Sequence, residues 1–215
     1  MKPLADCRLY AFVDAAYLHD RDPAWLAAQL AQGGADLIQL RAKSWSPDRI
    51  EATAARLVPV CRDHGVRLVI NDHPDIAARV GAPLVHLGQE DFFGPHPDHP
   101  AASAPSIPDT LGLGFSTHAP DQARRALAAG PAYIAIGPVF PTPTKPGRPA
   151  VTPDYVRWAA THLSSIPWFA IGGIHPGNLH TVLEAGATRI CVVSAILNAP
   201  DPAAACRQFR TLLPP

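Results

Sequence analysis

The sequence lacks the features by which several classes of protein are recognised. Its four cysteines include no C-x-x-C pair, and no apolar run approaches the length that spans a bilayer. The 18 basic and 18 acidic residues balance, with no basic block, which argues against a nucleic-acid or membrane surface. Hydrophobic residues make up 47% of the 215, so the chain can bury the core of one domain over residues 1–215.

Two further absences concern redox state and export. The cysteines are scattered in mostly apolar surroundings, which predicts buried, reduced thiols without a zinc or disulfide role. Asp6, Arg8 and Asp14 lie in or beside the first apolar stretch, so a signal peptide is not expected. The sequence therefore predicts a cytoplasmic protein that has no nucleic-acid or membrane partner, and it leaves the oligomeric state open, a homo-oligomer included.

Short apolar runs alternate along the chain with longer Ala-rich segments of helical character, which is typical of βα units and a parallel sheet. The predicted helices cover residues 23–32, 47–64, 120–129, 153–162, 177–185 and 202–212. The predicted strands begin near Arg8, Asp36, Arg67, Pro83, Leu111, Tyr133, Trp168 and Arg189. We expect an α/β fold, a single (β/α)₈ TIM barrel. A doubly wound sheet is disfavoured because G-x-G-x-x-G is absent after the first strand.

One connection departs from this pattern. The segment from Phe92 to Thr110 is rich in proline, which breaks helices by removing a hydrogen bond and clashing with the preceding turn. We expect the fourth helix to be short or irregular, and the sequence leaves open whether this segment is a lid.

Polar residues follow the second predicted strand, where barrel enzymes place their chemistry. Strand alternation points Gln39, Arg41 and Lys43 to one side, which predicts an anion site for a phosphate or diphosphate. A structural ion-pair network is the alternative.

Carboxylates follow the third and fourth strands at Asp72 and Asp91. Near Arg41 and Lys43 they would suit a hard divalent cation shared with a diphosphate, so we expect Mg²⁺ on both. The alternative is that one of them is a proton-transfer carboxylate. After the fifth strand, Ser116 and His118 could contact the same ligand, or His118 could cap the next helix.

A second group of candidates follows strands six to eight. Thr142, Thr144 and Lys145 stand between prolines, in an arrangement that suits either an anion site or a stiff surface turn. Gly172-Gly173 and Ser194 follow the last two strands, where barrels commonly bind phosphate. Two anion sites imply two phosphorylated small-molecule substrates.

The motifs QLRAK, IND, HLGQED, GFSTH, GPVFPTPTK, AIGGI and VVSAI, in this order, resemble thiamine phosphate synthases over almost the whole chain. The resemblance implies a transferase of alkyl or aryl groups that condenses hydroxymethylpyrimidine diphosphate with a carboxylated thiazole phosphate, releasing pyrophosphate in thiamine biosynthesis. It implies Mg²⁺ on Asp72 and Asp91, and catalytic roles for Arg41, Lys43, Ser116 and Lys145. The pyrimidine diphosphate would be bound by Gln39, Arg41, Lys43, Asn71, Ser116 and Lys145. The thiazole phosphate would be bound by Thr142, Thr144, Gly173, Val193 and Ser194.

The chain also departs from the family pattern. His73 stands where the family typically has arginine, and Arg148 follows Lys145 closely enough for a phosphate role. Two alternatives stay open: a related thiazole tautomerase with His118 as acid/base, and a barrel that senses a phosphorylated ligand without catalysis.

Overall fold

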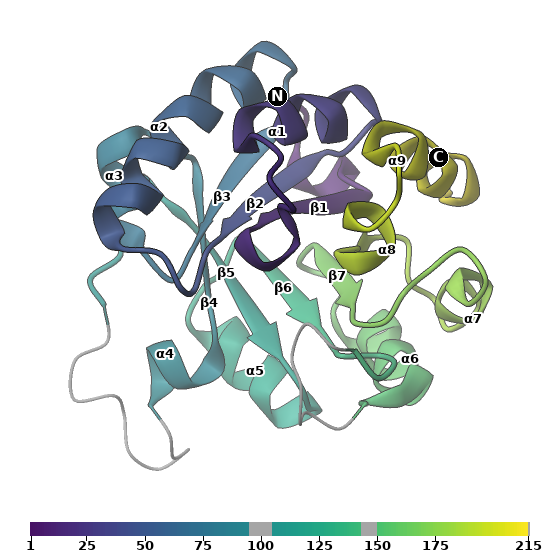
Figure 1. Cartoon of the computed structure of the whole chain (residues 1–215). Coiled ribbons are helices and arrows are strands. Elements are labelled where there is room, and N and C mark those ends of the chain that lie inside the picture. Colours follow the sequence, from purple (N-terminus) through teal and green to yellow (C-terminus); the bar gives the residue numbers. More distant parts are fainter. Residues whose placement is uncertain (95–104, 143–149, 215) are drawn as a thin grey trace.

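The computed structural model describes residues 1–94, 105–142 and 150–214. Its strands form a closed parallel barrel in the order of the sequence (Figure 1), which confirms the predicted (β/α)₈ fold. The strands are β1 (Leu9–Asp14), β2 (Leu37–Arg41), β3 (Arg67–Asn71), β4 (Leu84–Leu87), β5 (Gly112–Thr117), β6 (Tyr133–Ile136), β7 (Trp168–Ile171) and β8 (Ile190–Cys191).

Helices surround the barrel on its outside (Figure 1). They are α1 (Pro23–Gln32), α2 (Pro47–Asp63), α3 (Pro74–Val80), α4 (Gln89–Phe93), α5 (Pro120–Ala128), α6 (Thr152–His162), α7 (Leu179–Glu184), α8 (Ser194–Leu197) and α9 (Pro202–Leu212). Helices α3 and α8 were not predicted. Many of the helices begin at proline, whose fixed φ suits a first turn and whose missing N–H is not needed there.

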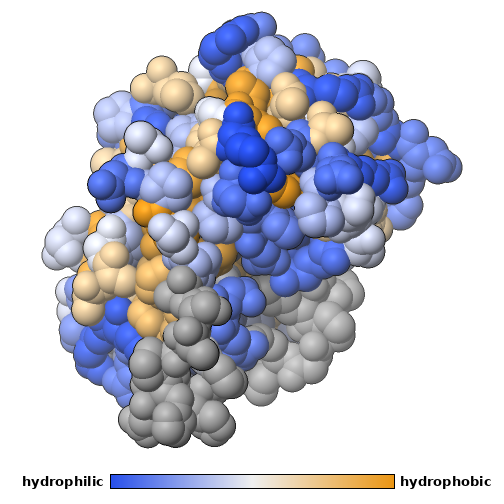
Figure 2. Space-filling view, turned by 90° about the vertical axis from the view of Figure 1, so that its left-hand side faces the viewer, coloured by the Kyte–Doolittle hydropathy of each residue, from blue (hydrophilic) through white to orange (hydrophobic). Residues whose placement is uncertain are grey.

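The helix after β4 is short, as the sequence predicted. Helix α4 has 5 residues and is followed by Gly94 as its cap, and the chain between Pro105 and Pro108 has no helix. Residues 95–104 lie outside the described part, so the structure does not test a lid there. None of the described helices is long and apolar enough to cross a membrane. On the side shown in Figure 2, hydrophilic residues cover most of the surface and hydrophobic ones form small areas between them.

Aromatic rings fill the middle of the barrel. Tyr10 stacks on Phe12 with ring centroids 5.1 Å apart, and it meets Tyr133 and Phe169 edge to face. Gly114 makes room for this cluster, since a Cβ there would lie 2.1 Å from Cζ of Tyr133. Such close packing of rings from different strands holds the barrel wall in one arrangement.

The four cysteines are buried and free, as predicted. Burial raises the pKa of the Cys61 thiol and of the Cys206 thiol to about 12, because the thiolate loses its hydration inside the protein. Both residues therefore pack as small apolar side chains.

Asp36 immediately precedes β2, and its carboxylate binds residues from both ends of the chain. Its Oδ2 accepts from the backbone N–H of Arg8 at 2.6 Å and of Leu9 at 3.0 Å, and from Nη1 of Arg210 at 3.2 Å. Lys2 Nζ lies 2.5 Å from Oδ1. One carboxylate thus ties β1, β2 and α9 together.

Replacing Asp36 by alanine should lower the free energy of unfolding by about 3 kcal/mol, because it leaves two strand N–H groups and a guanidinium without their acceptor. Urea unfolding followed by circular dichroism measures this. Asp121→Ala is the matched control, since that side chain is 93% exposed in its ion pair with Arg124 and should change little. Equal stability of the two variants would contradict the role of Asp36.

Candidate active site

A cavity opens at the end of the barrel where the strands terminate, and it encloses about 960 Å³ including its mouth. Every predicted binding or metal residue within the described ranges lines it. These residues are Gln39, Arg41, Lys43, Asn71, Asp72, Asp91, Ser116, Thr142, Gly173, Val193 and Ser194. Thr144, Lys145 and Arg148 fall outside the described residues, and their roles stay predictions.

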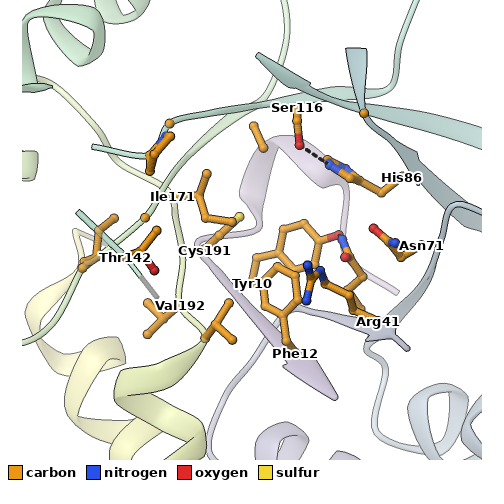
Figure 3. A pocket seen from close by; sticks show the side chains of 18 of the residues that line it. Tyr10, Phe12, Arg41, Asn71, His86, Ser116, Thr142, Ile171, Cys191 and Val192 are labelled. Carbon is orange, nitrogen blue, oxygen red and sulfur yellow. Dashed lines mark hydrogen bonds between the residues drawn. The ribbon is translucent and has the colours of Figure 1, made fainter. Parts of the chain in front are cut away.

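The cavity has two chemically different sides (Figure 3). Arg41, Asn71, His86 and Ser116 lie on one side, on the consecutive strands β2 to β5. The other side carries Thr142 and the mainly apolar Ile171, Cys191 and Val192. A charged group and an apolar ring of a ligand would each find a matching wall here.

Arg41 is held on the polar side by a buried ion pair. Its Nη1 donates to Oδ2 of Asp14 at 2.7 Å, and the two side chains are 15% and 2% exposed. The pair follows from strand register, because Asp14 on β1 stands opposite Arg41 on β2. Asp14 Oδ1 also accepts from the N–H of Ala16, so the carboxylate is fixed at both oxygens. The guanidinium is thereby positioned before any ligand arrives.

Lys43 and Asp72 form a second ion pair, in which Nζ donates to Oδ2 at 2.9 Å. Arg41 and Lys43 are thus both ion-paired, as the alternative of a structural network predicted, and both also line the cavity. Anion binding by these two residues stays a prediction. Asp72 has a φ of 65°, which L-residues with a side chain adopt at a cost in free energy. This strained backbone lies at the cavity wall.

Asp72 and Asp91 present a donor set that fits Mg²⁺. Both line the cavity with carboxylate oxygens, the ligand type that this ion takes from proteins in small numbers beside substrate phosphates. Oδ2 of Asp91 accepts from the N–H of Gly88 at 3.1 Å, which fixes its position at the start of α4. Within the described ranges no group of three or more His, Cys, Asp or Glu side chains forms a complete metal site. Water and phosphate oxygens would have to complete the coordination.

A chain of hydrogen bonds crosses the floor of the cavity. Gln39 Nε2 donates to Tyr10 Oη at 2.6 Å, and Tyr10 Oη lies 2.8 Å from Tyr133 Oη. Tyr133 Oη lies 2.9 Å from Nδ1 of His86, whose Nε2 lies 2.9 Å from Ser116 Oγ (Figure 3). We call these five residues the polar chain. All of them are buried, and burial raises the pKa of both tyrosines, so their hydroxyls stay protonated.

Sequence reasoning gave no role to Tyr10, Asp14, His86 or Tyr133. The available signal was a polar group at an inward position of an apolar strand: Tyr10, Phe12 and Asp14 alternate along β1, and His86 interrupts the aliphatic run of β4. Buried polar groups need partners, so several such positions at one barrel end predict a network.

Close packing explains why glycine occupies the two positions after β7. Gly172 and Gly173 have φ of 107° and 63°, and a Cβ at Gly173 would lie 2.6 Å from the carbonyl oxygen of Pro141. A Cβ at Gly172 would lie 2.4 Å from Cα of Pro138. The segment after β6 therefore lies directly against these glycines. Their role in phosphate binding stays a prediction.

His118 lies at the cavity with Nδ1 against the carbonyl oxygen of Gly137, while its backbone N–H donates to Oε1 of Gln122 at 2.7 Å. The imidazole therefore does not cap α5; the Gln122 side chain bonds the backbone there instead. Cys191 also lines the cavity, and burial raises the pKa of its thiol well above the usual range.

Comparisons with known proteins point to one family. A family model described as thiamine monophosphate synthase matches residues 9–196. A thiamine-phosphate synthase of Thermus thermophilus is 50% identical over 181 residues, covering 84% of each chain. One of Acidothermus cellulolyticus is 44% identical over 213 residues, 98% of this chain and 96% of that one. The solved thiamine phosphate pyrophosphorylase of Pyrococcus furiosus superposes with a TM-score of 0.82 at 27% identity, covering 97% and 96% of the two chains.

The left-handed backbone at Asp72 yields a stability test. Asp72→Asn should change the free energy of unfolding little, because asparagine tolerates this conformation and Lys43, the partner in the ion pair, is 56% exposed. Asp72→Val should lower it by about 2 kcal/mol, since a β-branched side chain is strained at positive φ. Urea unfolding measures both variants, and Asp72→Gly should be at least as stable as Asp72→Asn. A valine variant as stable as the asparagine one would show that the backbone is not strained.

Proposed function

Because the chain belongs to the thiamine monophosphate synthase family, we propose that its cavity joins a pyrimidine diphosphate to a thiazole phosphate and releases pyrophosphate. Its activity is that of a thiamine-phosphate synthase, a transferase that acts on two phosphorylated small molecules. The observation that carries the proposal is the two-sided cavity, in which fixed cations and carboxylates face a mainly apolar wall.

The diphosphate belongs on the polar side in this proposal. Arg41, held by Asp14, offers a preformed guanidinium, and Lys43 and Asn71 add further donors beside it. Guanidinium groups bind phosphate oxygens through paired hydrogen bonds. Fixed donors of this kind stabilise the negative charge that grows on a departing diphosphate without reorganising, which is the main electrostatic route to catalysis.

Mg²⁺ would be held by Asp72 and Asp91. When bound, it supplies positive charge that neutralises the diphosphate and orients it as a leaving group. Lys43 holds one oxygen of Asp72 at 2.9 Å, and the second has no partner among the described residues. The same carboxylate can therefore orient Lys43 and meet a cation.

The thiazole phosphate belongs on the opposite side, beside Thr142, Gly173, Val193 and Ser194. The apolar residues of that side would hold the heterocycles, so that the thiazole nitrogen faces the methylene carbon of the pyrimidine. Positioning of two reactants in one cavity can supply much of the lowering of the barrier. The cytoplasm is the compartment that we propose for this reaction.

A product assay tests the function. We expect the purified protein to form thiamine phosphate and pyrophosphate in equal amounts from pyrimidine diphosphate, thiazole phosphate and Mg²⁺. Chromatography measures the thiamine phosphate, and a pyrophosphate assay measures the second product. Isomerisation of the thiazole phosphate without the pyrimidine would indicate a tautomerase instead. Binding of both compounds without product would indicate a sensing barrel.

The metal assignment is tested within the same assay. Asp91→Asn should lower turnover at least about tenfold and raise the Mg²⁺ concentration needed for half-maximal rate, because a neutral amide is a weaker ligand. The amide oxygen can still accept from Gly88, so the fold should persist. Asp154→Asn, at an exposed position of α6, is the control. An unchanged Mg²⁺ requirement in Asp91→Asn would refute this assignment.

A further inference from the structure

The loop that follows β7 has three successive carbonyl groups, each with a hydrogen-bond partner. The carbonyl oxygens of Ile171 and Gly172 accept from backbone N–H groups of the segment after β6, at 2.8 and 3.0 Å. The carbonyl oxygen of Gly173 accepts instead from a side chain, through Nδ2 of Asn178 at 2.9 Å. Backbone partners persist when a side chain is replaced. The orientation of the Gly173 carbonyl is therefore the one that depends on a single side chain.

The amide of Asn178 is engaged at both of its ends. Its Oδ1 accepts from the backbone N–H of His175 at 2.8 Å, so the side chain spans the loop from Gly173 to His175. An asparagine that precedes a helix commonly caps it by accepting from an N–H of the first turn. Asn178 directly precedes α7 and makes no such bond. Its side chain therefore serves the loop and not the helix.

The geometry of the peptide bond determines what this loop presents to the cavity. Gly173 and Ile174 line the cavity, whereas Asn178 is not among the described residues that line it and so lies behind the loop. The peptide between Gly173 and Ile174 is trans, and in a trans peptide the carbonyl and the following N–H point in opposite directions. Because the carbonyl points back to Asn178, the N–H of Ile174 points to the cavity side.

Two backbone donors of this loop are available to a ligand. Within the described ranges, neither the N–H of Gly173 nor that of Ile174 has a hydrogen-bond acceptor, although Ile174 is only 4% exposed. A donor in such a place costs free energy until it finds an acceptor. Successive N–H groups in a turn are a common way to bind an anion.

We propose that Asn178 is a positioning residue that orients the peptide between Gly173 and Ile174 so that the N–H of Ile174 binds the phosphate of the thiazole substrate. The inference rests on the proposed function, which puts this phosphate beside Gly173 and Ser194. It adds the backbone of Ile174 to the residues that bind the phosphate, and it gives Asn178 an indirect role through that N–H.

The decisive measurement compares thiazole phosphate with its dephosphorylated alcohol, with Mg²⁺ and pyrophosphate present to fill the polar side of the cavity. In ¹⁵N-labelled wild-type protein, thiazole phosphate should move the amide protons of Gly173 and Ile174 downfield in NMR spectra, and the alcohol should not. In Asn178→Ala, the Ile174 shift should be lost. The calorimetric affinity for thiazole phosphate should fall about tenfold and that for the alcohol less than about twofold, because only the phosphate meets this N–H.

Steady-state kinetics give a second readout, which general damage to the fold would not produce. In Asn178→Ala the KM for thiazole phosphate should rise about tenfold, while the KM for pyrimidine diphosphate changes less than about twofold. Asn178→Asp keeps the oxygen that accepts from His175 and removes only the donor to Gly173, so it should show the same split. It decides the matter if the alanine variant does not fold.

Asn198→Asp is the matched control. It makes the same chemical change at an exposed asparagine after α8, whose side chain has no hydrogen bond within the described ranges. It should leave both affinities unchanged.

Equal affinity for thiazole phosphate in the wild type and the Asn178 variants, or an equal loss for the phosphate and the alcohol, would overturn the proposal. Unmoved amides of Gly173 and Ile174 in the wild type would overturn it as well. These measurements do not depend on turnover. A wild-type protein that shows the amide shifts but makes no thiamine phosphate would refute the proposed function and support the role of Asn178.

Discussion

The need to pair every polar group inside the barrel is the constraint on which this structure depends. Tyrosine, histidine, glutamine and aspartate side chains enter the barrel where other strands contribute aliphatic residues, and each would cost free energy without a partner. These side chains find their partners in two sets of hydrogen bonds. One is the Asp14–Arg41 ion pair, and the other is the polar chain from Gln39 to Ser116. Both sets fix groups that line the cavity, so one requirement stabilises the fold and shapes the site.

The division of the cavity follows from where these sets lie. The ion pairs stand at the ends of β1 to β3, while β6 to β8 end in apolar residues and are followed by glycine or apolar residues. A diphosphate and its metal therefore suit the first side, and an uncharged ring suits the wall opposite. Charged groups that are already oriented by Asp14 and Asp72 lose little entropy on binding, which favours catalysis by preorganised electrostatics over covalent chemistry.

Much of this could be predicted from the sequence because it follows from local periodicity. The barrel, the α1 and α9 boundaries and the convergence of Gln39, Arg41 and Lys43 come from alternation within one strand or helix. The Asp14–Arg41 pair and the polar chain depend on register between strands and on ring orientation, which a single sequence does not encode in any nearby pattern. Helix α3 was missed because it has only 7 residues, Pro74 and Val80 included, which is too short for a clear helical pattern.

A crystal structure of the protein with Mg²⁺ and pyrimidine diphosphate would test the division of the cavity most directly. The account predicts the diphosphate against Arg41 and Asn71, with the metal between it and the carboxylates of Asp72 and Asp91. It also predicts that Thr142 and Ser194 stay clear of this ligand. A diphosphate bound beside Thr142 and Ser194 instead, or a metal bound away from both carboxylates, would contradict the account.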